Sequence, residues 1–79
     1  MPNTVFARFI KSMSDRELVA YAAACKTSPA YLTGHLRPRK KTPRLVMMSR
    51  LVRNSAGQLT REDVLEHFFP TSDFESDAA

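Results

Sequence analysis

The sequence predicts an all-α fold built from five short helices. Apolar residues recur at the spacing of amphipathic helices, residues typical of N-caps precede the apolar stretches, and no segment alternates like a β-strand. The chain has 79 residues, 43% of them hydrophobic and 25% charged. This length suits one domain, which we place at residues 1–69, followed by a disordered acidic tail at 70–79.

The first two helices are predicted in the N-terminal third. Asn3 or Thr4 can cap the first helix, whose apolar face contains Val5, Phe6, Phe9, Ile10 and Met13. Ser14–Glu17 has the pattern of a capping box, in which a serine hydroxyl and a carboxylate each accept from a free backbone N–H. The second helix follows, with an inward face at Leu18, Tyr21, Ala22 and Cys25.

Proline marks two of the later helix starts. Ser28 and Pro29 are a good N-cap and first residue for a third helix, predicted at Pro29–Leu36. Thr42 and Pro43 repeat that pattern before a fourth helix, predicted at 42–54. Its inward face is expected at Leu45, Met48, Leu51 and Val52.

The fifth helix is predicted between Thr60 and Pro70. Gly57 suits a left-handed C-terminal cap before it, and Glu62 and Asp63 fall in its first turn, where the helix dipole favours negative charge. Its buried face is expected at Val64, Leu65, Phe68 and Phe69. Because adjacent phenylalanines cannot both point inward, part of this face could instead form a subunit interface.

Basic residues are concentrated in the middle of the chain, which has a net charge of +4. No Asp or Glu occurs from Leu18 to Arg61, whereas the same stretch contains Lys26, Arg37, Arg39, Lys40, Lys41, Arg44, Arg50, Arg53 and Arg61. Such a segment suits a polyanion such as DNA. A merely solvated basic surface is the alternative, but the single sign of charge favours nucleic acid.

The segment Leu18–Leu36 has the spacing of two helices that cross through a tight turn. Ala22 supplies the small side chain at the crossing, and Leu32 is the apolar anchor of the second helix. In such pairs the N-terminal residues of the second helix face the major groove.

These residues resemble the phage Cro/CI-type helix-turn-helix regulators, in particular the small YdaS/Cro-like proteins. The resemblance covers Leu18–Phe69 and continues through Arg37-Pro38-Arg39, the fourth helix and Gly57–Asp63. It implies a lambda-repressor/Cro-like helix-turn-helix domain that binds double-stranded operator DNA, without a cofactor. It also implies a homodimer in the cytoplasm of a bacterial or phage-infected cell, which represses or activates transcription by occupancy.

The resemblance also implies which residues contact DNA. Pro29, Ala30, Thr33 and Gly34 fall where the recognition helix faces base edges, and we expect specificity from Thr33 and Arg37. Lys26, Lys40, Lys41 and Arg44 are expected to bind phosphates. The whole predicted site is Lys26, Thr27, Ser28, Pro29, Ala30, Tyr31, Thr33, Gly34, Arg37, Arg39, Lys40, Lys41 and Arg44. Lys26 stands where the family has a glycine, and His35 where it has a large apolar residue.

Other functions are less well supported by the sequence. His35 and His67 have no other metal-ligating residues at the spacing of a metal site. Cys25 is expected in the core, and Ser28 has no histidine or acid that could act as its catalytic base. We therefore predict no enzyme and no metal, and the apolar runs are too short for a membrane span. The competing hypothesis is a protein-interaction module, such as an antitoxin or an antagonist of a host regulator, that binds through Phe68, Phe69 or Phe74.

Overall fold

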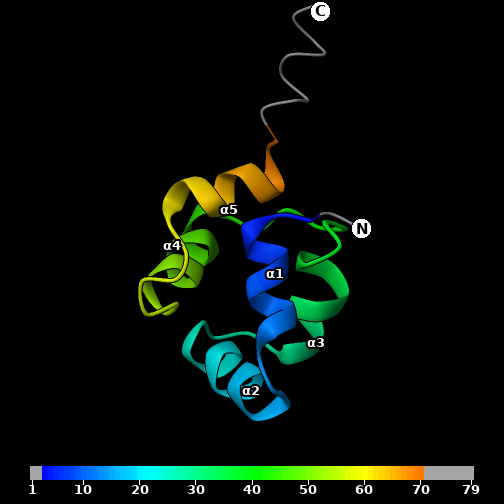
Figure 1. Cartoon of the computed structure of the whole chain (residues 1–79), viewed down its shortest axis with the longest axis vertical. Helices are drawn as coiled ribbons and strands as arrows, with labels where there is room; N and C mark the ends of the chain where they lie inside the picture. Colours follow the sequence, from blue (N-terminus) through cyan, green and yellow to red (C-terminus); the bar gives the residue numbers. More distant parts are fainter. Residues whose placement is uncertain (1–2, 71–79) are drawn as a thin grey trace, which may run out of the picture.

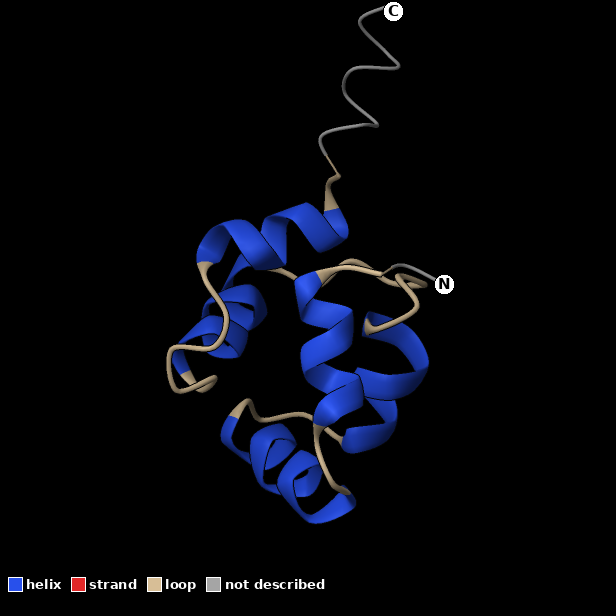
Figure 2. Ribbon diagram, viewed as in Figure 1, coloured by secondary structure: helices blue, strands red, loops and turns tan. Residues whose placement is uncertain are grey.

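Helices form all the regular structure in the computed structural model, which describes residues 3–70 (Figures 1 and 2). They are α1 (Val5–Ser12), α2 (Asp15–Ala24), α3 (Pro29–Tyr31), α4 (Leu45–Arg53) and α5 (Arg61–Phe68). A five-residue π-helix, η1 (Leu32–Leu36), continues α3 directly. The prediction of an all-α chain with five short helices is confirmed. The predicted tail beyond Pro70, including Phe74, lies outside the described residues.

Side-chain caps begin four of the helices as the sequence predicts. The hydroxyls of Thr4, Ser14, Ser28 and Thr60 each accept from a backbone N–H three residues further on. Ser14 and Thr60 form full capping boxes, because Glu17 and Asp63 accept from the N–H of the cap residue at 2.9 Å in both cases. Each cap stabilises its helix by about 1 kcal/mol.

The predicted start of the fourth helix is wrong. Helix α4 begins at Leu45 and its N-cap is Arg44, whose side chain makes no capping bond; Pro43 is buried ahead of the helix. Leu45 was expected in the core, yet it is 77% exposed. As the first helical residue, it lies on the wall of an open groove between α4 and α5 instead.

The fifth helix also buries fewer residues than predicted. Val64 and Phe68 are buried, whereas Leu65 lines the same groove and Phe69 is 46% exposed. Phe69 follows the last residue of α5 with a non-helical backbone, so it leaves the helical face that Phe68 shares. None of the helices within residues 3–70 is long and apolar enough to cross a membrane.

The core is centred on α1, which lies in the middle of the molecule with the other helices around it (Figure 1). Phe6 and Ile10 from α1, Leu32 and Leu36 from η1 and Leu51 from α4 have essentially no exposed surface. These five residues come from three elements that are well separated along the chain, so no helix has an independent core.

His67 is a buried polar residue in this core, a role that sequence reasoning missed. Its Nε2 donates to the carbonyl of Leu36 at 2.7 Å, and its Nδ1 accepts from the hydroxyl of Thr4. The ring packs against Phe6 and Phe68, with centroids 4.8 and 4.6 Å away. Burial lowers the pKa of His67, so the neutral imidazole joins α5 to the start of α1 and the end of η1.

Candidate nucleic-acid interface

The turn between α2 and α3 holds Lys26 in a left-handed conformation, with φ of 61°. The N–H of Lys26 donates to the carbonyl of Ala23 at 3.1 Å, and the N–H of Thr27 to that of Ala22 at 2.9 Å. These two bonds define a Schellman motif, in which the left-handed position is usually glycine. A lysine there costs roughly 1 kcal/mol. Lys26 therefore holds the left-handed conformation at a small cost in backbone strain.

The two helices meet where the sequence predicts a crossing. Ala22 is 1% exposed and Leu32 is fully buried, so the small residue and the anchor both face the core. Ser28 caps α3 through the N–H of Tyr31 at 3.1 Å, and Pro29 is the first helical residue. Helices α2 and α3 pack against each other across this short turn.

The segment formed by α3 and η1 ends in a π-turn, and Leu36 rather than His35 faces the core there. The N–H of Arg37 donates to the carbonyl of Leu32, five residues earlier, at 2.8 Å. Leu36, four residues after the buried Leu32, is buried, whereas His35 is exposed, with its ring 5.6 Å from that of Tyr31. The inward apolar residue is thus displaced by one position, and His35 needs no place in the core.

The outer face of α3 and η1 is open and chemically simple. Ser28, Ala30, Gly34 and His35 are exposed. A Cβ added to Gly34 would meet nothing within 4 Å, so packing inside the protein does not require glycine there. The hydroxyl of Thr33 donates to the carbonyl of Pro29 at 3.0 Å, which leaves Thr33 mainly its methyl group and an acceptor oxygen for a partner.

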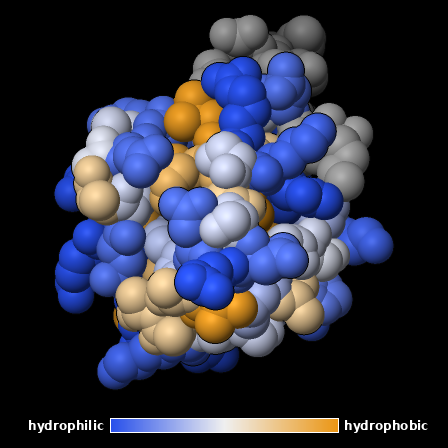
Figure 3. Space-filling model, turned by 60° about the horizontal axis from the view of Figure 1, so that its bottom comes forward, coloured by the Kyte–Doolittle hydropathy of each residue, from blue (hydrophilic) through white to orange (hydrophobic). Residues whose placement is uncertain are grey.

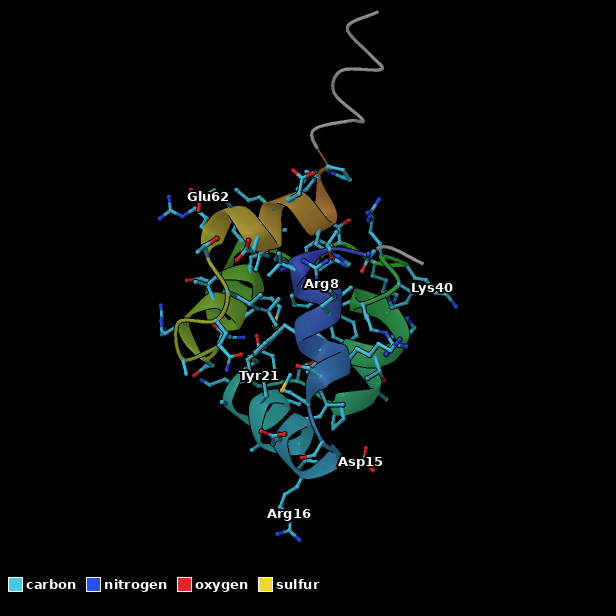
Figure 4. The ribbon with its side chains drawn as sticks, viewed as in Figure 1. Arg8, Asp15, Arg16, Tyr21, Lys40 and Glu62 are labelled. Carbon is cyan, nitrogen blue, oxygen red and sulfur yellow. The ribbon has the colours of Figure 1, made fainter. Side chains whose placement is uncertain are left out.

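A second Schellman motif closes the other end of this helix. Arg39 has φ of 62°, its N–H donates to the carbonyl of Leu36 at 3.1 Å, and the N–H of Lys40 donates to that of His35 at 2.8 Å. A cation therefore occupies the left-handed position at both the turn before α3 and the turn after η1. Lys40 projects away from the molecule in Figure 4, and Lys41 is also exposed.

The cationic residues of the predicted site form two groups at opposite ends of α3 and η1. Arg37, Arg39, Lys40 and Lys41 follow η1, where Arg39 lies close enough to His67 for its charge to lower the pKa of that ring further. The Nε atoms of Arg37 and Arg39 are buried without a hydrogen-bond partner among the described residues.

The second group lies beside α4 and contains residues that sequence reasoning missed. Thr27, Tyr31 and Arg44 line one hollow, and Lys26 lines its neighbour. Arg50 contributes to both hollows and Arg53 to the second. The polar face of the fourth helix was visible in the sequence, but its position beside the turn depends on tertiary packing. Figure 3 shows a face on which hydrophilic residues surround small apolar areas.

The remaining chemically reactive groups are engaged in the fold. Cys25 is fully buried, its Sγ donates to the carbonyl of Arg50 at 3.6 Å, and burial raises its thiol pKa. No group of three or more His, Cys, Asp or Glu side chains within residues 3–70 is placed to hold a metal ion.

No family model, curated protein or solved structure matches this chain.

Proposed function

We propose that this chain is a sequence-specific DNA-binding regulator of the Cro/CI helix-turn-helix type, as found in phages and prophages. It acts in the cytoplasm by occupying an operator and thereby blocking or recruiting polymerase. The observation that carries the proposal is the open face of α3 and η1, which lies between two turns that each hold a cation in a left-handed conformation.

The arrangement suits entry of α3 and η1 into the major groove. Pro29, Ala30 and Gly34 would face the base edges, and the absence of a side chain at Gly34 permits close approach of the backbone. The cations that flank the helix at its two ends would face the two sides of a groove about 12 Å wide. Lys26 and Arg44 at one end and Lys40 and Lys41 at the other can then reach the flanking phosphates.

Sequence discrimination would come from few contacts. The face offers a methyl group from Ala30, a methyl and an acceptor oxygen from Thr33, and the guanidinium of Arg37. Phosphate binding should therefore contribute most of the affinity, and the affinity should fall steeply with salt.

We further propose that the regulator binds as a homodimer. A groove of about 430 Å³ between α4 and α5 has Leu45, Met48 and Leu65 in its wall, and Leu45 is itself 77% exposed. An isologous contact that buries Leu45 of each copy would cover this face. Such a dimer predicts operator half-sites about 34 Å apart.

The test is a binding assay with duplex DNA from the flanks of the gene, at two or more salt concentrations. The double variant Lys40→Ala, Lys41→Ala should bind more weakly and with a shallower salt dependence, because about two phosphate contacts are lost. Substitution of Thr33 or Arg37 should instead change the preference among duplexes. If a scrambled duplex binds as tightly as every candidate operator, the chain is not a specific regulator.

A protein-interaction module is the second candidate, favoured by the consecutive exposed residues Leu45 and Val46, 77% and 61% accessible. An antitoxin or an antagonist of a host regulator that binds through the exposed Phe69 would lose its function on substitution of Phe69. It would retain function in the Lys40→Ala, Lys41→Ala variant, whereas a DNA-binding regulator would show the opposite pattern.

A further inference from the structure

Two shallow hollows lie side by side between the α2–α3 turn and α4. One has a volume of about 600 Å³ and the other about 440 Å³, and both are lined by Val46 and Arg50. Arg44 belongs to the first, and Lys26 and Arg53 to the second. No acidic residue lines either hollow. Four cations therefore surround a concave surface that nothing in the described chain neutralises locally.

The spacing of these cations fits an extended anion better than a single one. Arg44 and Arg53 are nine residues apart along α4, or about 13 Å at 1.5 Å per residue. One DNA strand rises about 3.4 Å per nucleotide, so this length corresponds to about four nucleotides. A lone phosphate or sulfate could contact only part of the row.

Hydrogen bonds fix α4 beside the turn and thereby fix the hollows. The side-chain Nδ2 of Asn54 donates to the carbonyl of Ala24 at 3.3 Å and to that of Arg50 at 2.9 Å. The same Arg50 carbonyl accepts from Cys25. The backbone of Arg50 is thus hydrogen-bonded to the end of α2. Because α4 is already held in this position before DNA binds, binding would cost less conformational entropy.

We propose that α4 is a second phosphate-binding element, in which Arg50 and Arg53 continue the contact with the DNA backbone that begins at Lys26 and Arg44. The inference rests on the proposed DNA-binding function and extends it to a helix that lies outside the α2–α3 pair. The ligand is the backbone of double-stranded DNA, independent of base sequence. Val46, 61% exposed between the two hollows, would contact the apolar sugar faces.

The test measures binding of the full chain to a mixed-sequence 30-base-pair duplex across a range of NaCl concentrations. Arg50→Gln and Arg53→Gln should each weaken binding about five- to tenfold at low salt and reduce the log–log salt slope by about 0.9. Arg50→Lys, which keeps the charge, should keep the slope. Arg8→Gln is the matched control, because Arg8 is exposed on α1 and lines neither the two hollows nor the groove between α4 and α5.

The outcomes separate this inference from the proposed function. If the two glutamine variants keep the wild-type slope while the Lys40→Ala, Lys41→Ala variant does not, α4 makes no phosphate contact and the broader proposal stands. If wild-type protein binds no duplex, both proposals fail. If Arg50→Gln changes sedimentation of the free protein but not DNA binding, the surface joins two copies of the chain and the inference is wrong. Circular dichroism melts check folding, and Arg53→Gln with Arg50→Lys carries the test if Arg50→Gln unfolds.

Discussion

The phenolic hydroxyl of Tyr21 donates a 2.6 Å hydrogen bond to the backbone carbonyl of Leu51. Tyr21 belongs to α2, and Leu51 lies in the last turn of α4, where helix carbonyls lack partners in their own helix. Both residues are buried, and burial raises the pKa of the Tyr21 hydroxyl, which therefore stays protonated and able to donate. This bond, with those of Asn54, joins α2 to α4.

Removal of this hydroxyl should destabilise the protein without altering its surface. Tyr21→Phe leaves a buried carbonyl without its partner, and we expect the free energy of unfolding to fall by about 1–2 kcal/mol. Urea unfolding should show a lower midpoint with an unchanged slope. Tyr31→Phe is the control, because the half-buried Tyr31 makes a ring contact with His35 but its hydroxyl is not placed in such a bond. Equal losses of unfolding free energy in both variants would show that the hydrogen bond to Leu51 does not stabilise the fold.

Stability should depend on pH through His67. Its pKa is lowered in the folded protein, while the unfolded chain has a value near 6.5. Between these two values the unfolded chain binds more protons, so stability is complete above about pH 7 and declines as pH falls below 6.5. Urea midpoints measured from pH 7.5 to 5 should therefore decrease steadily.

The His67→Gln variant identifies the group responsible. Glutamine can still donate to the Leu36 carbonyl but does not titrate, so the decline between pH 7 and 5 should flatten, at the expense of lower stability at pH 7.5. His35→Gln is the matched control, since the His35 ring is exposed. A full pH dependence that survives in the His67 variant would assign the effect to other groups.

Gly34→Ala should separate stability from DNA binding. A Cβ at this position meets nothing in the protein, and alanine is favoured over glycine in a helix interior by about 1 kcal/mol, so thermal stability should rise. If the backbone approaches base edges there, affinity for the operator should fall while binding to mixed-sequence DNA changes little. Gly57→Ala is the contrasting control, because Gly57 has φ of 82° and alanine there should destabilise the fold. An operator affinity that is unchanged in Gly34→Ala would exclude close approach at this glycine.

Lys26→Gly should make the protein more stable and a poorer DNA binder. Glycine relieves the left-handed strain, and we expect a gain of roughly 0.5–1 kcal/mol in the free energy of unfolding. The loss of one phosphate contact should also reduce the salt slope of DNA binding by about 0.9. Comparison with Lys26→Ala, which removes the charge but keeps the strain, assigns each effect to its cause. A slope that is unchanged in both variants would remove Lys26 from the interface.

Local patterns predicted the helices well because their causes are local. The caps at Thr4, Ser14, Ser28 and Thr60 depend on residues three positions apart, and all four are present. The pattern at Thr42 and Pro43 misled, since a threonine and a proline also suit an extended segment that buries Pro43. Nothing local distinguishes those two uses of the same dipeptide.

Features that depend on contacts between distant segments could not be predicted from the sequence. His67 is an unremarkable polar residue in a helix until the Leu36 carbonyl and Thr4 hydroxyl, from distant segments, are placed on either side of it. The grouping of Arg50 and Arg53 with Lys26 likewise follows from the packing of α4, while the residues of the turn itself were predicted from spacing alone.

The two Schellman motifs have a consequence for how such a chain could change over generations. At Lys26 and Arg39 the best residue for the backbone is glycine, and the best residue for a polyanionic partner is a cation. At each of these two positions, a change that improves the stability of the fold would weaken binding to a polyanion, and the reverse. Selection for thermal stability would favour glycine at these turns, and affinity for the polyanion would fall unless cations were gained elsewhere. Charge added along α4 would be one route by which that exchange is balanced.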